Sequence, residues 1–112
     1  FYPSFIFFVL LDMRISEHEI KLIKKLARQI FGNKTKVYLF GSRVDNGKKG
    51  GDIDLFITGD QKSNFTVAHK IDFLVELKSL IGNQKIDVIL DTDVTRQKKQ
   101  FHRSITQQAI EL

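Results

Sequence analysis

Three short apolar runs, separated by longer segments with helical spacing, limit most strongly how this chain can fold. The runs are residues 37–40, 53–58 and 86–90, and each has the length and the β-branched or aromatic content of a strand. Strands this short are stable only when they pair with one another and are covered by helices. The order of elements therefore predicts an α/β (α+β) domain, in which a small mixed β-sheet packs on helices.

Start and stop signals place the helices between these runs. Ser16 and Glu19 have the spacing of a capping box, and Gly32 ends the apolar repeat that follows them. Residues 67–81 predict a second helix, which ends at Gly82. Its predicted apolar stripe consists of Val67, Ile71, Leu74, Leu77 and Ile81. From Thr95 to the end, the wide spacing of Phe101, Ile105 and Ile110 predicts a further helix.

The composition restricts the chemistry and the surroundings. The chain has 112 residues and no cysteine, which is the size of one domain and excludes disulfides, thiol catalysis and thiolate metal sites. We expect a cytoplasmic protein without membrane contact, because the apolar segment 1–12 is far shorter than the ~20 residues that span a bilayer. We interpret residues 1–12 as an upstream extension or an expression artefact, and residues 13–112 as the single domain. The net charge of +5 is compatible with phosphate-bearing ligands or an acidic partner, and equally with lysines and arginines that only solvate the helix faces.

Two aspartates on the second predicted strand indicate a metal site. Asp52 and Asp54 lie two residues apart, so alternation along a strand sends both carboxylates to one face. Their repulsion is costly unless cations lie between them. Oxygen ligands without a nearby histidine or cysteine favour Mg²⁺ or Mn²⁺, and a pair of such ions assists displacement at phosphorus. The alternative is that both aspartates are only solubilising charges.

A glycine-serine turn precedes these aspartates. Gly41 and Ser42 follow directly on the first predicted strand, where backbone amides and a hydroxyl can bind a phosphate. Arg43 is either a further phosphate contact or a surface partner of Asp45. The spacing does not fit a P-loop, and no dinucleotide-binding glycine pattern occurs.

A third carboxylate is expected from the neighbouring strand. Asp87 interrupts an apolar run there, and Asp91 and Asp93 are the alternatives. The three histidines, His18, His69 and His102, show no ligand spacing and are assigned no role in the site.

These motifs resemble the DNA polymerase β nucleotidyltransferase superfamily, and most closely its bacterial minimal nucleotidyltransferases, which are often partners of HEPN-domain toxins. The resemblance rests on residues 39–43 (Leu-Phe-Gly-Ser-Arg) and 51–55 (Gly-Asp-Ile-Asp-Leu). Two departures are the loop 44–50, which is rich in glycine and lysine, and Gly51, where many relatives carry serine.

The resemblance implies a polymerase β-like fold and a nucleotidyltransferase active site. It implies that Asp52, Asp54 and Asp87 are the catalytic residues and bind two Mg²⁺ (or Mn²⁺) ions. It also implies that Gly41 and Ser42, with Arg43 beside them, bind ATP or another nucleoside triphosphate. The expected reaction moves AMP onto a hydroxyl group of a HEPN-domain protein, as in a toxin–antitoxin pair.

Two other functions are compatible with the same sequence. The first is a catalytically idle module that neutralises a partner by binding alone. The second is a nucleic-acid binder that uses the lysines and arginines, although we expect no direct binding to nucleic acid. The base preference, the acceptor and homo-oligomerisation stay open.

Overall fold

A computed structural model describes residues 15–40, 53–82 and 84–112. The proposed extension, residues 1–12, lies outside these ranges, and so do residues 41–52. The described elements are α2 (Glu17–Phe31), β1 (Lys36–Phe40), β2 (Ile53–Thr58), the 3-10 helix η2 (Lys62–Asn64), α3 (Val67–Ile81), β3 (Ile86–Leu90), α4 (Asp93–Gln97), α5 (Lys99–Gln108) and β4 (Ile110–Glu111).

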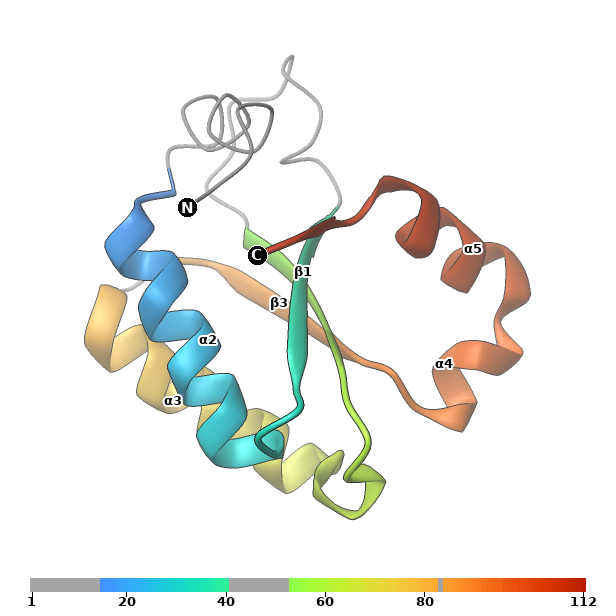
Figure 1. The fold of residues 1–112 in the computed structure, drawn as a ribbon, viewed down its shortest axis with the longest axis horizontal. Coiled ribbons are helices and arrows are strands. Elements are labelled where there is room, and N and C mark those ends of the chain that lie inside the picture. The colour runs from blue at the N-terminus through green and yellow to red at the C-terminus, as the bar shows by residue number, and fades with distance from the viewer. Residues whose placement is uncertain (1–14, 41–52, 83) are drawn as a thin grey trace.

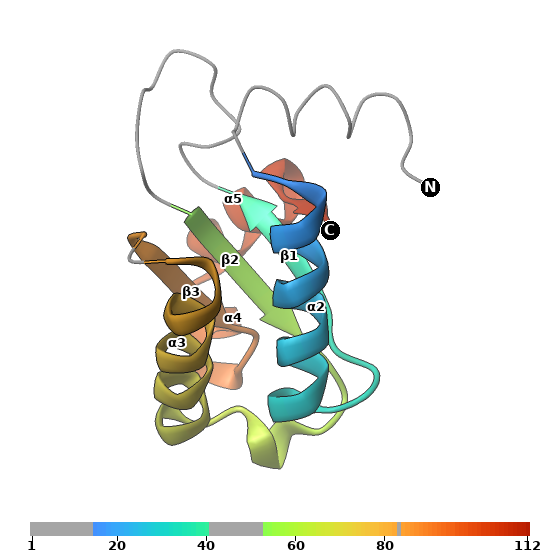
Figure 2. The ribbon, with the colours of Figure 1, turned by 90° about the vertical axis from the view of Figure 1, so that its left-hand side faces the viewer.

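The strands form one mixed four-stranded sheet in the order β3-β2-β1-β4. β2 pairs antiparallel with β1 and parallel with β3, while β4 pairs antiparallel with β1. Helices α2 and α3 lie side by side on one face of the sheet, and α4 and α5 lie on the other (Figures 1 and 2). The predicted fold class, a small mixed sheet packed on helices, is confirmed.

The core lies between the sheet and the α2–α3 pair. Alternate residues of β2 and β3 point into it, as the two-residue period of a strand requires, while Phe56 of β2 is buried on the opposite face. Phe31 of α2 packs against Phe65 and Phe73, with ring centroids 5.4 and 5.6 Å apart. The core consists of Ile15, Ile20, Ile23, Leu26, Ala27, Phe31, Val37, Leu39, Ile53, Leu55, Ile57, Phe65, Phe73, Leu77, Ile86, Val88, Leu90 and Leu112.

Both long helices begin and end where the sequence predicts. The capping box of α2 is formed, because Glu19 N donates to Ser16 Oγ and Ser16 N donates to Glu19 Oε1, both at 3.0 Å. Gly32 and Gly82 follow the two helices with positive φ angles of 127° and 95°. Glycine adopts such angles without strain, and this is why each helix can turn away at that point.

Two expectations for the helices are right only in part. The apolar stripe predicted for α3 is confirmed for Leu74, Leu77 and Ile81, which lie in the core or pack against it. It is wrong for Val67 and Ile71, which are 73% and 53% exposed, while Phe73, outside the predicted stripe, is fully buried. The C-terminal helix is interrupted at Lys98 and gives way to β4, where Ile110 pairs with Leu39. The open edge of β1 offers the backbone partners that make this last strand favourable. Across the described ranges, no helix combines the length and apolar character needed to cross a membrane.

Candidate functional site

Two of the three predicted acidic residues meet on adjacent strands. Asp54 of β2 and Asp87 of β3 are direct partners in the parallel register. Their Cα atoms are therefore separated by about the inter-strand spacing, ~4.8 Å, and their side chains leave the same face of the sheet. Asp54 is half-buried and Asp87 is exposed. The flanking residues of both strands are buried on the opposite face, so the alternation of the strands itself holds the two carboxylates outside the core.

The end of β1 lies beside this pair. Phe40 is the partner of Asp54 in the antiparallel register, and it is the residue that precedes Gly41 in the chain. Gly41, Ser42, Arg43 and Asp52 lie outside the described residues, and their roles stay predictions. Within the described ranges, no group of three histidine, cysteine, aspartate or glutamate side chains is arranged to hold a metal ion.

A hollow of about 570 Å³ opens beside the two aspartates at the free edge of β3. Both carboxylate residues line it, and Lys70 of α3 adds a positive charge. The remaining lining is apolar: Phe40, Leu74, Ile86, Val88 and Ile89. The hollow thus combines one positively charged and two acidic residues in its lining.

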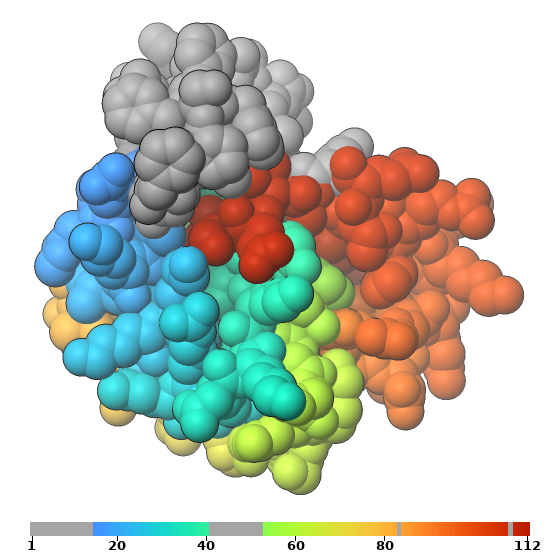
Figure 3. All heavy atoms as spheres, in the orientation of Figure 1, coloured from blue at the N-terminus to red at the C-terminus, as the bar shows by residue number. Residues whose placement is uncertain are grey.

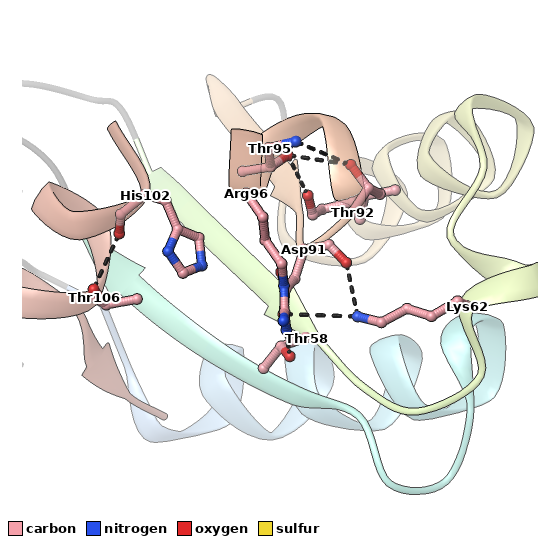
Figure 4. A network of polar contacts seen from close by, with 9 residues as sticks. Thr58, Lys62, Asp91, Thr92, Thr95, Arg96, His102 and Thr106 are labelled. Carbon is pink, nitrogen blue, oxygen red and sulfur yellow. Dashed lines mark hydrogen bonds and ion pairs between the residues drawn. The ribbon is translucent and has the colours of Figure 1, made fainter. Parts of the chain in front are cut away.

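Asp91, an alternative third carboxylate, has a structural role instead. It is only 3% exposed, and its carboxylate accepts hydrogen bonds from Arg96 Nε at 2.8 Å and Thr58 Oγ1 at 2.8 Å. Lys62 Nζ donates to its carbonyl oxygen at 2.7 Å (Figure 4). The hydrogen bond from Arg96 outweighs the effect of burial and lowers the pKa of Asp91 to about 2. Because it lies four residues beyond Asp87, ~13 Å along a strand, it is too distant to share a metal ion with Asp54.

Asp93, the other alternative, lies in the first turn of α4. A carboxylate there interacts favourably with the positive end of the helix dipole. The structure therefore favours Asp87 as the third carboxylate, because Asp87 lies opposite Asp54 and neither Asp91 nor Asp93 does.

A second cavity, of about 280 Å³, lies on the same face of the sheet between β1, β2 and the α4–α5 segment. We call it the α5 cavity. Space-filling atoms show α4 and α5 as a projection beside the sheet (Figure 3). His102 points from α5 toward the sheet (Figure 4). Its ring meets the Phe56 ring edge-on, with centroids 6.1 Å apart. The α5 cavity is lined by Tyr38, Phe56, Thr58, Asp91, Arg96, His102, Thr106 and Ala109.

Sequence reasoning missed the residues of the α5 cavity. Tyr38 and Phe56 looked like ordinary strand residues, and His102 was assigned no role. A signal was present, because Phe56 shares the alternation of Asp54 and therefore the same face of β2. The helix that closes the cavity over that face could not be placed without the tertiary structure.

Comparison with known proteins gives one match. A family model described as nucleotidyltransferase domain matches residues 20–111, which include every described strand. No curated protein matches the chain.

Proposed function

Because the chain belongs to the nucleotidyltransferase domain family, we propose that it moves a nucleoside monophosphate, AMP from ATP, onto a hydroxyl acceptor. The observation that carries this proposal is the pairing of Asp54 with Asp87 on neighbouring strands, beside the strand that leads to Gly41 and Ser42. Asp52, two residues before Asp54, is proposed as the third acidic residue.

The donor set fits divalent cations of the magnesium type. Two carboxylates on directly paired strand positions repel each other, and this repulsion is relieved when hard cations bind between them. We assign Mg²⁺ (or Mn²⁺) binding to Asp52, Asp54 and Asp87. When bound, the ions neutralise the charge on the triphosphate and align it for in-line displacement.

The chain's own residues then divide the remaining work. Gly41 and Ser42, with Arg43, hold the pyrophosphate that departs. The oxygen of the acceptor hydroxyl bonds to the α-phosphorus, and Asp87 accepts the proton that this hydroxyl loses. At the same time the bond between the α-phosphorus and the pyrophosphate breaks. The protein contributes mainly by positioning the reactants and by compensating charge.

The acceptor is proposed to belong to another protein, in keeping with the resemblance to antitoxins that modify HEPN-domain toxins. Two surface features support this. Val67, Ile71 and Val75 form an exposed apolar stripe on α3, with exposures of 73%, 53% and 63%. A groove of about 390 Å³ follows the outer edge of β3 and contains Val67, Lys70 and Val88.

This β3 groove leads to the acidic pair. It shares Lys70, Val88 and Ile89 with the hollow that contains Asp54 and Asp87. A partner that covers the α3 stripe and lies along the β3 groove would bring a hydroxyl to Asp87. Lys70 and Lys98 in the groove favour an acidic partner segment.

The decisive experiment is to weigh the HEPN-domain partner after incubation with this protein, ATP and Mg²⁺. We expect a mass increase of one or more AMP groups. Asp54→Asn and Asp87→Asn should each slow the transfer by about 10²-fold or more. Asp72→Asn removes the same charge from an exposed position of α3 and should leave the rate unchanged.

An unmodified partner in the wild-type reaction would overturn the proposal. If Asp54→Asn still neutralised the partner fully, neutralisation by binding alone would be the better description. If the main activity were RNA binding that weakens steeply with salt, the basic residues rather than the aspartates would carry the function.

A further inference from the structure

We infer that the α5 cavity is the binding site for the nucleobase of the triphosphate substrate. This inference rests on the proposed function and adds to it the place where the nucleoside lies. It concerns residues that neither the family match nor the sequence motifs assign to any role.

The α5 cavity lies on the sheet close to the acidic pair. Asp54, Phe56 and Thr58 alternate along β2, and the last two line the α5 cavity. The cavity therefore opens on the face that carries Asp54 and Asp87. Phe56 is two residues from Asp54, about 7 Å along the strand. A ribose bridges a gap of this size between an α-phosphate and its base.

The line along which the reacting groups lie also points to the cavity. Asp87 of β3, Asp54 of β2 and Phe40 of β1 lie in one row across the sheet. With the acceptor at Asp87 and the pyrophosphate beyond Phe40, the line from acceptor through phosphorus to leaving group crosses the strands. The nucleoside is attached to the same phosphorus and leaves this line sideways, and one direction open to it runs along the strands. In that direction, the face of the sheet leads over Tyr38 and Phe56 into the α5 cavity.

The side chains that line the α5 cavity match the chemistry of a nucleobase. A nucleobase has flat apolar faces and a polar edge. Phe56 forms part of the cavity with two rings inclined to it, Tyr38 at 6.3 Å and 48°, and His102 at 6.1 Å and 74°. Any of the nucleobases can stack on such rings, because each has flat π-faces. The volume of about 280 Å³ lies just below the range of sites for whole drug-sized ligands, as expected for one part of a larger ligand.

Arg96 supplies fixed donors at the edge of the cavity. Its Nε and one terminal nitrogen donate to Asp91 at 2.8 and 2.9 Å, and these two bonds hold the plane of the guanidinium. A guanidinium carries five N–H groups, and the others have no partner among the described residues. They can donate to the ring nitrogen or carbonyl oxygen at the edge of a base. Thr58 and Thr106 add hydroxyl groups to the same lining.

The test separates the base from the triphosphate. Calorimetry with Mg²⁺ would measure the affinity of a non-hydrolysable ATP analogue (α,β-methylene-ATP) and of inorganic tripolyphosphate. Tyr38→Leu and His102→Ala should each weaken the analogue about fivefold to 100-fold and leave tripolyphosphate unchanged. Gln107→Ala, an exposed position of α5 outside the cavity, is the matched control and should change neither affinity.

A measurement on the wild-type protein makes the test independent of how the variants fold. Diethyl pyrocarbonate modifies accessible histidines, and the extent at each can be read by mass spectrometry. The ATP analogue with Mg²⁺ should protect His102, whereas tripolyphosphate should not. His18, which is exposed on α2, serves as the internal reference and should react equally in all samples.

The outcomes distinguish this inference from the function on which it rests. If the analogue binds but His102 is not protected, and both variants bind it normally, the base lies elsewhere and only the present inference falls. If neither the analogue nor tripolyphosphate binds, the proposed function fails and the nucleobase site fails with it.

Discussion

A carboxylate as buried as that of Asp91 is stable in its charged form only because donors surround it. Arg96 of α4 and Thr58 at the end of β2 donate hydrogen bonds to it, and the ammonium group of Lys62 in η2 lies 3.6 Å from its Oδ2. The group thus ties three segments together below the α5 cavity. Its pKa is lowered from 3.8 to about 2, so the folded protein binds its proton more weakly than the unfolded chain does. The resulting stabilisation is complete above pH ~4 and is lost as the pH falls toward 2.

At the scale of the residue, we predict that Asp91→Asn lowers the free energy of unfolding by about 2 kcal/mol at pH 6. Urea denaturation monitored by circular dichroism would measure this. Between pH 4 and 2 the wild-type protein should lose this advantage, and the two unfolding curves should approach each other. Asp60→Asn, at an exposed position, is the control. An unchanged difference across that pH range would show that the charge of Asp91 is not the source of the stability.

The site residues differ in how well the sequence reveals them. Asp54 and Asp87 stand out, because each is a charge inside an apolar run. Their meeting follows from the strand register, which no local pattern specifies. Tyr38, Phe56 and His102 carry no such contrast. Aromatic residues in a strand are as common in cores as in binding sites, and only the packing of α5 over them makes a cavity.

At the scale of the element, the two helix-ending glycines differ in their surroundings. Gly32 has φ 127°, and an added Cβ would lie 3.0 Å from Gln61 Oε1. Gly82 has φ 95°, and an added Cβ would meet nothing within 4 Å. At both positions a side chain would be strained by the positive φ angle, but only at Gly32 would it also contact a neighbouring side chain.

We therefore predict that Gly82→Ala destabilises the protein by about 1 kcal/mol, and Gly32→Ala by more. Thermal unfolding of both variants would measure the difference. Adding Gln61→Ala to Gly32→Ala should remove the excess, because the conflict involves the Gln61 side chain. If the double variant stayed as unstable as Gly32→Ala, the cost would come from the backbone alone.

The C-terminal elements depended on partners far away in the sequence. Residues 99–108 have helical spacing, but nothing local requires the break at Lys98 or the strand at Ile110. Leu112 N donates to Val37 O at 2.9 Å, so the last residues complete the sheet beside β1. A two-residue strand has little preference of its own, and the open edge decides its conformation.

At the scale of the molecule, the exposed apolar stripe of α3 is a surface in contact with water. Val67, Ile71 and Val75 lie at four-residue intervals, on one side of the helix. An exposed apolar stripe is typical of a surface that binds another protein.

We predict that Ile71→Glu weakens binding to the HEPN-domain partner proposed above by about tenfold or more and leaves binding of the ATP analogue intact. Surface plasmon resonance against the immobilised partner would measure the first effect, and calorimetry the second. Gln29→Glu introduces the same charge on α2 and should change neither. Normal partner binding by Ile71→Glu would exclude the α3 stripe from the interface.

The sequence by itself determined the helices α2 and α3, the strands β1 to β3 and the fold class, and it marked Asp54 and Asp87 as candidates. Capping groups, glycines and the two-residue alternation of strands act through neighbouring residues, so their effect can be recognised without knowing the rest of the fold. Only the tertiary structure decided that Asp87, rather than Asp91, stands opposite Asp54, that Asp91 is bound by Arg96, and that α5 closes a cavity over Phe56. These facts depend on register and on contacts between distant segments, which are set by the packing of the whole chain.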